Sequence, residues 1–137
     1  MNHLAEETRA YLEAHRETLD LPFLHSFPKN CCENASLVLG YVLKDAHPSM
    51  EVMVVKADRP GHGMHFWLEA GGKIFDITAD QVEEISSPVF GGAFIPLPLR
   101  EYEVYEKTEI GQELKSHDWR DKLRILPEIS QVVRGLA

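Results

Sequence analysis

The chain of 137 residues is 44% hydrophobic and 26% charged, a composition that suits one folded domain with a buried core and argues against a disordered chain. Its 14 Lys and Arg against 22 Asp and Glu give a formal charge of −8, which argues against binding to nucleic acid or to an anionic membrane surface, because both need clustered basic side chains. No apolar run is long enough to span a bilayer, residues 1–16 lack a secretory signal core, and the two adjacent cysteines do not suit a disulfide framework, so we predict a cytoplasmic protein.

Two helices are predicted in the first third of the chain. Apolar residues recur at helical spacing over residues 4–18, and the Leu-Pro-Phe sequence at 21–23 ends that helix. Asn30 is a favourable N-cap for a second helix over residues 31–44, and the His-Pro-Ser sequence at 47–49 stops it.

Three strands are predicted next, and two of them form a hairpin. Residues 50–57 have the apolar middle of a buried strand, and residues 58–63, with one proline and two glycines, form a turn-rich loop. The apolar runs at 64–70 and 73–79 flank the Gly-Gly pair at 71–72, which is a hairpin signal.

The last third combines a loop, a strand and helices. Residues 86–98 hold three prolines and a Gly-Gly pair, so we predict a long irregular loop, either a lid over a cleft or an ordered connection. Alternation at 102–106 predicts one more strand, and from about Glu109 the spacing is helical, with Pro127 dividing this region into two pieces. The apolar residues of that helical region are Leu114, Trp119, Leu123 and Leu126. This order of elements predicts a single α+β domain over residues 1–137 with an antiparallel sheet.

A cysteine stands at the start of the second predicted helix. Backbone N–H groups and the positive end of the helix dipole favour a thiolate there, and the thiolate is the nucleophilic form. Cys32 leads a helical stripe through Ser36 and two leucines, whereas Cys31 leads a comparable stripe through Ala35. We take Cys32 as the candidate nucleophile and keep Cys31 as the alternative.

The hairpin register decides which side chains can meet that cysteine. If residues 71–72 form a two-residue turn, Trp67 pairs with Asp76 and His65 pairs with Thr78. These four side chains then share one face of the hairpin, and Asp76 lies diagonal to His65, within reach of its imidazole. The opposite face would carry Phe66, Leu68, Phe75 and Ile77.

Cysteine, imidazole and carboxylate are together the parts of an activated nucleophile. In this hypothesis Cys32 attacks a carbonyl-type centre. His65 takes the proton of the thiol and later delivers one to the leaving group, while Asp76 fixes the tautomer and stabilises the imidazolium.

Three segments in this order resemble the transglutaminase-like branch of the papain-like cysteine enzymes. They are the helix-opening cysteine with small residues behind it at 32–36, the His-Phe-Trp strand at 65–69, and the aspartate that opens a polar stretch at 76–81. The resemblance implies a papain-like, transglutaminase-like core. It implies a hydrolase or acyltransferase, of protease, amidase or transglutaminase type, acting on an amide, peptide or thioester carbonyl of a small-molecule, peptide or protein substrate without a cofactor or metal.

Two departures and two alternatives accompany this hypothesis. Papain-type enzymes bind the oxyanion with a glutamine upstream of the cysteine, but the first glutamine here is Gln81, so a backbone N–H of Cys32 or the amide of Asn30 or Asn34 would substitute. The Gly-Gly-x-Cys signature of the acetyltransferases is also missing. One alternative is a non-catalytic binding or regulatory domain on the same scaffold.

The other alternative is a zinc site. Its ligands would be Cys31, Cys32, His62 and His65, but adjacent cysteines lack the spacer that lets two thiolates reach one ion. We instead expect His62 to be exposed to solvent and Trp67 to belong to the core. We expect Asp80 to cap a short turn and Thr78 to make a cross-strand hydrogen bond.

Overall fold

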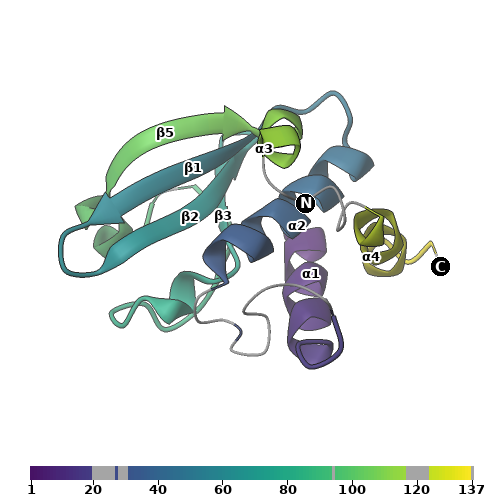
Figure 1. Cartoon of the computed structure of the whole chain (residues 1–137), viewed down its shortest axis with the longest axis horizontal. Coiled ribbons are helices and arrows are strands. Elements are labelled where there is room, and N and C mark those ends of the chain that lie inside the picture. Colours follow the sequence, from purple (N-terminus) through teal and green to yellow (C-terminus); the bar gives the residue numbers. More distant parts are fainter. Residues whose placement is uncertain (20–26, 28–30, 94, 117–123, 137) are drawn as a thin grey trace.

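A computed structural model describes residues 1–19, 27, 31–93, 95–116 and 124–136 (Figure 1). In chain order the elements are α1 (Asn2–Ala14), α2 (Cys32–Ala46), β1 (Val52–Arg59), β2 (Gly63–Ala70), β3 (Lys73–Asp76), the 3-10 helix η2 (Ala79–Gln81), β4 (Val89–Gly92), the 3-10 helix η3 (Leu97–Glu101), β5 (Glu103–Glu109), α3 (Ile110–Ser116) and α4 (Ile125–Val133). The strands form one antiparallel sheet in the order β4-β3-β2-β1-β5, which confirms the predicted α+β class. None of the described helices is long and apolar enough to cross a bilayer.

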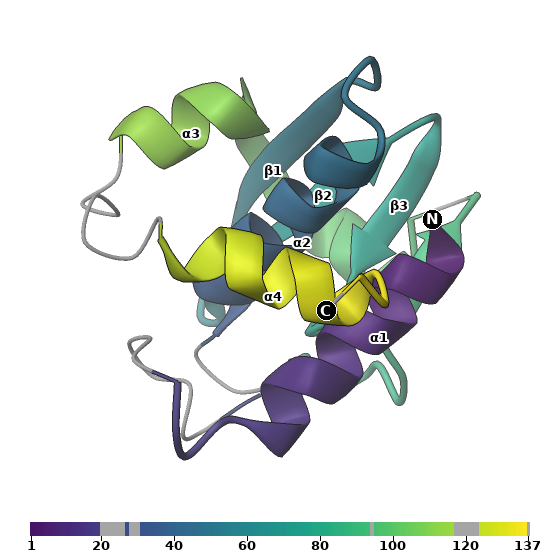
Figure 2. The ribbon, with the colours of Figure 1, turned by 90° about the vertical axis from the view of Figure 1, so that its right-hand side faces the viewer.

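The helix α2 is the centre of the fold. It packs against β1 and β2 on one side and against α1, α3 and α4 on the other sides, as Figure 2 shows for α1 and α4. The residues that follow each cysteine in its stripe are therefore buried, because several neighbours cover this helix. This helix begins one residue later than predicted and ends at Ala46, two residues beyond the predicted end and directly before the His-Pro-Ser sequence. Its N-cap is Cys31, and the predicted N-cap Asn30 lies outside the described residues.

The first helix is displaced toward the N-terminus relative to its prediction. It begins at Asn2 and ends at Ala14, four residues before the expected end, and residues 15–18 form turns. Its buried face consists of Ala5, Thr8 and Leu12, at helical spacing. Residues 21–23, which were expected to end the helix, lie outside the described residues.

The hairpin of β2 and β3 has the predicted register. Ala70 pairs with Lys73 and Leu68 pairs with Phe75, so the turn contains two residues, Gly71 and Gly72. The strand β3 ends at Asp76, three residues earlier than predicted, because the next residues turn into η2.

The two faces of the hairpin belong to two different clusters of the core. The helix-facing cluster includes Phe66, Leu68, Phe75 and Ile77, as predicted. Trp67 lies in the second cluster, on the outer face of the sheet, with Val55, Ile74, Val82, Leu99 and Tyr102. The outer face is thus covered by the chain between η2 and β5 and not by the long helices.

Gly72→Ala is expected to lower the free energy of unfolding by about 1–2 kcal/mol, the cost of a left-handed conformation for a residue with a Cβ atom. Gly72 has φ +72 and no heavy atom within 4 Å of an added Cβ, so only the backbone contributes. Urea denaturation measures the change. Gly72→Asn should cost clearly less, because asparagine tolerates this region; equal costs for the two variants would contradict the explanation.

Residues 86–98 are more ordered than the predicted irregular loop. They contain β4, which pairs with β3, and the start of η3. Gly91 has φ +87, and the pairing of β3 with β4 shifts register between Ile74 and Phe75, so β4 bends at this glycine. The sequence predicted only an irregular loop here. This order favours the connection over the lid, with Phe94 outside the described residues.

The C-terminal third differs from its prediction at the proline. The predicted strand at 102–106 becomes β5, shifted by one residue at its start and extended to Glu109. Pro127 lies inside the first turn of α4 and does not divide a helix, because a proline in the first turn loses no intrahelical N–H bond. Trp119 and Leu123 lie outside the described residues.

Candidate active site

His65 and Asp76 form a buried pair on the outer face of the hairpin. The Nε2 atom of His65 lies 2.6 Å from Oδ2 of Asp76, and each side chain is only 1% exposed. His65 is on β2, and Asp76 is the last residue of β3, on the same face as predicted. The two-residue turn of the hairpin is what puts both side chains on one face, because a slip of one residue would send one of them to the helices.

A second interaction holds the carboxylate of Asp76. Its Oδ1 atom accepts hydrogen bonds from the backbone N–H of Thr78 at 3.2 Å and from the Thr78 hydroxyl at 3.4 Å. Thr78 was expected to bond across strands; it bonds to Asp76 because the chain turns after β3. With Oδ1 occupied, Oδ2 is oriented toward the imidazole.

The sulfur that meets His65 is that of Cys32. Cys32 is the first residue of α2, it is half-buried, and it lies close enough to His65 to contribute to the raised pKa of the imidazole. Cys31, one residue earlier, is 1% exposed and belongs to the helix-facing core. Because Asp76 occupies Nε2, Nδ1 is the ring nitrogen that is left for a thiol. The structure therefore brings Cys32, His65 and Asp76 together, in the order sulfur, imidazole, carboxylate.

The environment of His65 favours its charged form. Burial alone would lower the pKa of the imidazole, but the Asp76 carboxylate, with a smaller contribution from Cys32, raises the pKa from 6.5 to about 10. His65 is consequently an imidazolium at neutral pH. A cation beside the first turn of a helix is the setting in which cysteine thiolates are stabilised.

Gln81 is a member of the site that the sequence analysis missed. Its Nε2 atom lies 2.7 Å from Nδ1 of His65, the ring nitrogen that Asp76 does not contact. No motif marks this residue; its position in the polar stretch after Asp76 was the only signal. Gln81 reaches the ring because it ends η2, directly after the turn that follows β3.

The turn that carries Gln81 is anchored to α1. Arg9 donates to both carboxylate oxygens of Asp80, at 2.7 and 2.9 Å, and to the carbonyl oxygen of Ile77 at 2.6 Å. Asp80 is therefore an ion-pair partner and not the predicted cap; Thr78 occupies the N-cap position of η2. The bidentate ion pair with Asp80 and the hydrogen bond to Ile77 together fix the orientation of this turn.

Aromatic rings surround the imidazole on the outer face. The ring centroids of Trp67 and Tyr102 lie 6.0 and 5.8 Å from that of His65. Trp67 is buried in the core, as predicted, and its indole N–H has no hydrogen-bond partner among the described residues. Arg59 lies over the ring of Tyr102 at 5.8 Å and pairs with Glu101. These contacts confine the imidazole to one orientation.

The zinc alternative is not supported by the described residues. They contain no group of three or more His, Cys, Asp or Glu side chains that could hold a metal ion. His62 is exposed in the β1–β2 loop, as predicted, and its Nδ1 atom lies 3.2 Å from the carbonyl oxygen of Pro60. Cys31, by contrast, is buried in the core.

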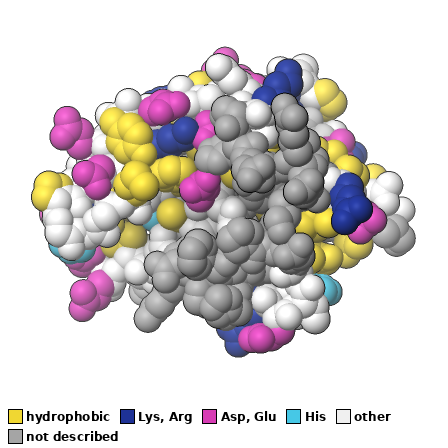
Figure 3. Space-filling view, viewed as in Figure 1, with side chains coloured by type: hydrophobic (Ala, Val, Ile, Leu, Met, Phe, Trp, Pro, Cys, Tyr) yellow, Lys and Arg dark blue, Asp and Glu magenta, His cyan; other side chains and the backbone are white. Residues whose placement is uncertain are grey.

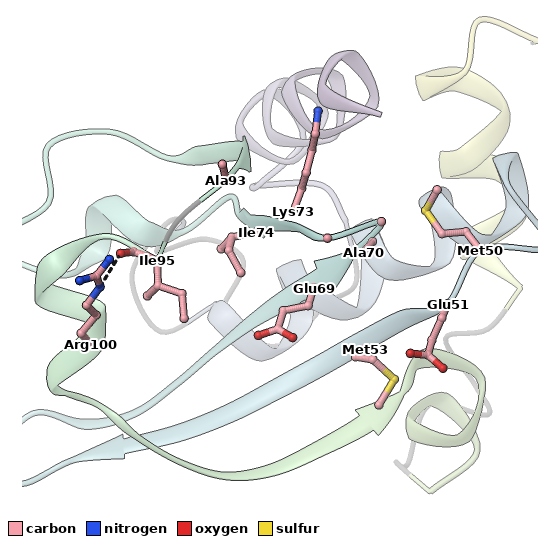
Figure 4. A pocket seen from close by; sticks show the side chains of 12 residues that line it. Met50, Glu51, Met53, Glu69, Ala70, Lys73, Ile74, Ala93, Ile95 and Arg100 are labelled. Atoms are coloured by element: carbon pink, nitrogen blue, oxygen red, sulfur yellow. Dashed lines mark hydrogen bonds between the residues drawn. The ribbon is translucent and has the colours of Figure 1, made fainter.

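A cavity of about 600 Å³ lies at the other end of β2, around the hairpin turn. Figure 4 shows Met53 and Glu69 on neighbouring strands, with Ile95 and Arg100 on the opposite wall, where Arg100 donates to the carbonyl oxygen of Ile95. The residues that line it include no cysteine or histidine. None of the residues that line this cavity belongs to the group formed by Cys32, His65, Asp76 and Gln81.

A comparison of the chain with family models, with curated proteins and with solved structures finds no match in any of the three. The transglutaminase-like resemblance of the segments at 32–36, 65–69 and 76–81 therefore stays a prediction. What bears on function is the geometry of the side chains themselves.

Proposed function

We propose that this protein is a cysteine hydrolase or acyltransferase that uses Cys32, His65 and Asp76 on an amide, peptide or thioester carbonyl. One observation carries the proposal: a buried imidazole–carboxylate pair at 2.6 Å lies close enough to a cysteine at the first position of a helix for that cysteine to contribute to the pKa of the imidazole. Each of these features favours a thiolate. A papain-like core, which the sequence resemblance implies, is part of the same proposal.

The reaction would proceed in two halves. The Cys32 thiolate attacks the carbonyl carbon, forming a C–S bond and a tetrahedral oxyanion, and the imidazolium of His65 gives its proton to the leaving group as the scissile bond breaks. Water or an amine then loses a proton to His65 and attacks the resulting thioester, which releases the acyl product and the Cys32 thiolate. Asp76 keeps the proton on Nε2 throughout, so that Nδ1 is the nitrogen that exchanges protons.

Donors for the oxyanion would come from the start of α2. The first N–H groups of a helix have no partner within it, and the N-cap side chain of Cys31 makes no capping bond to them. The backbone N–H of Cys32 is thus a suitable donor to an oxyanion formed on the adjacent sulfur. Asn34 is buried in the same turn, and Asn30 lies outside the described residues.

An exposed apolar patch near the start of α2 suits an acyl group or an apolar peptide side chain. Met64 and Tyr105 are 61% and 53% exposed, and the Tyr105 hydroxyl donates to the Met64 sulfur at 3.2 Å. Tyr105 is within electrostatic range of Glu33, the residue after Cys32. In Figure 3 hydrophobic side chains gather over the strands, with acidic side chains around them. Large exposed apolar side chains are common in substrate-binding surfaces.

The non-catalytic alternative expects a thiol that the imidazole cannot reach. The proximity of Cys32 to His65, which contributes to the raised pKa of the imidazole, argues against it, as does the half-buried position of Cys32 beside the fully buried Cys31. A scaffold that only binds a partner has no need of an imidazolium held by a buried carboxylate.

Alkylation by iodoacetamide, followed by peptide mapping across pH 5–9, tests the proposed function. At pH 6 the wild-type protein should be alkylated at Cys32 about tenfold faster than a free thiol of ordinary acidity, which is almost wholly protonated at that pH. Cys32→Ala should abolish this reaction, and Cys31→Ala should leave it unchanged.

His65→Ala is the decisive companion variant. It should slow the alkylation at pH 6 by about tenfold or more, because the sulfur loses the cation that stabilises it. The proposal is wrong if Cys31 is the residue modified, if neither thiol reacts faster than a free one, or if His65→Ala has no effect.

A further inference from the structure

The imidazole of His65 has more partners than it has positions for hydrogen bonds. Nε2 is bound to Asp76 at 2.6 Å, which leaves Nδ1 for every other group. Gln81 lies 2.7 Å from Nδ1, and Cys32 lies close enough to the same ring to contribute to its raised pKa. A ring nitrogen carries either one hydrogen or one lone pair, so it makes one strong hydrogen bond at a time.

Both orientations of the Gln81 amide compete with the sulfur. If the amide presents its NH₂ group, it donates to the lone pair of Nδ1, and the imidazole cannot then take the proton of Cys32. If the amide presents its oxygen, it accepts the Nδ1 hydrogen that would otherwise pair with the thiolate. In either orientation the bond to Gln81 weakens the bond between His65 and Cys32.

Gln81 is held in this position by the fold. The two residues that precede Gln81 in the turn are fixed, since Ala79 is buried and Asp80 is bound by Arg9. Val82, the next residue, belongs to the outer cluster of the core. The amide therefore contacts the ring as a consequence of the turn that follows β3.

We propose that Gln81 is a positioning residue that competes with Cys32 for Nδ1 of His65 and so holds the nucleophile in a less reactive resting state. This inference rests on the proposed function, because it concerns the same sulfur and imidazole. A substrate that displaces the amide from Nδ1, or accepts its hydrogen bond, would release the imidazole to the sulfur at the moment of binding. The competition can be tested, because it predicts that removal of the Gln81 amide makes Cys32 more reactive.

Two nearly isosteric variants separate this role from a structural one. Gln81→Met keeps the length of the side chain and removes the amide, so the alkylation of Cys32 by iodoacetamide at pH 6 should become about threefold to tenfold faster, the range expected for loss of one competing hydrogen bond. Gln81→Glu places a carboxylate on the same nitrogen, so the reaction should become about tenfold slower and its pH midpoint should rise. A merely structural residue would slow the reaction in both variants.

The other charged groups near the pair are the same in every variant. They are Asp76 on β3, the Arg9–Asp80 ion pair in the turn before Gln81, and Arg59 and Glu84, which lie within electrostatic range of the uncharged Tyr102. Matched controls are Gln131→Met and Gln131→Glu on the exposed face of α4, which should change neither the rate nor the midpoint.

The outcomes distinguish the two proposals. Opposite effects of Gln81→Met and Gln81→Glu support the competition, whereas equal effects, no effect, or slower alkylation of Gln81→Met overturns it and leaves the proposed function intact. If His65→Ala does not change the reactivity of Cys32, the proposed function itself fails. The ¹⁵N shift of Nδ1 provides a second measurement. Gln81→Met should move it toward the value of a ring hydrogen-bonded to a thiolate, and an unchanged shift would overturn the competition.

Discussion

Asp76→Asn is expected to lower the turnover of an activated thioester by about 10⁴-fold, the size of loss known for the equivalent change in Ser-His-Asp enzymes. The amide of an asparagine would donate to Nε2, which leaves the ring hydrogen on Nδ1 and prevents Nδ1 from accepting the proton of Cys32. The imidazolium of His65 also loses its counter-charge, which is 2.6 Å away in the native site. Steady-state hydrolysis measures the loss of turnover that follows from the wrong tautomer. Alkylation at pH 6 measures the loss of thiolate that follows from the missing counter-charge.

The Asp76→Asn variant is expected to fold, because its side chain can keep the contact with Thr78. The oxygen of the new amide can still accept the hydrogen bonds from Thr78, so the turn after β3 keeps its shape. Asp58→Asn, at an exposed position on β1, is the matched control and should leave turnover unchanged. A loss of less than tenfold at Asp76, in a protein with a native circular-dichroism spectrum, would remove Asp76 from the proposed mechanism.

The hairpin and its polar face could be predicted because they depend on local rules. Two glycines set the turn, the turn sets the register, and the register puts His65 and Asp76 on one face. The choice of Cys32 over Cys31 was less certain from sequence, since both lead apolar stripes. The structure favours Cys32 by where α2 begins: Cys31, at the N-cap, is buried in the core, and Cys32, the next residue, contributes to the raised pKa of the imidazole.

The parts of the site that sequence could not provide depend on contacts between distant segments. Arg9 meets Asp80 across 71 positions of the chain, and no periodic pattern indicates such a pairing. Gln81 reaches His65 only because the chain turns at Asp76 instead of continuing the strand. The strand β4 was missed for a similar reason, because its glycines and neighbouring prolines predict a loop unless the pairing with β3 is known.

The stability of the protein is expected to fall as the pH rises from below 6.5 to above 10, by as much as about 5 kcal/mol in total from His65 alone if each pKa unit contributes about 1.4 kcal/mol. The pKa of His65 is raised from 6.5 to about 10 in the folded state, against burial, by the Asp76 carboxylate. In this interval the folded protein binds a proton that the unfolded chain has lost. The stabilisation is therefore complete below pH 6.5 and is lost as the pH passes through the folded value.

Urea unfolding at several pH values, in the wild type and in His65→Gln, isolates this contribution from that of every other group. Glutamine still offers an N–H donor to Asp76, so the variant should fold, but it cannot titrate. The wild-type free energy of unfolding should decline more steeply with pH than that of the variant, and the two curves should converge toward pH 10. Parallel curves would mean that His65 does not carry its proton in the folded state, and the imidazolium that activates Cys32 would then be lost from the mechanism as well.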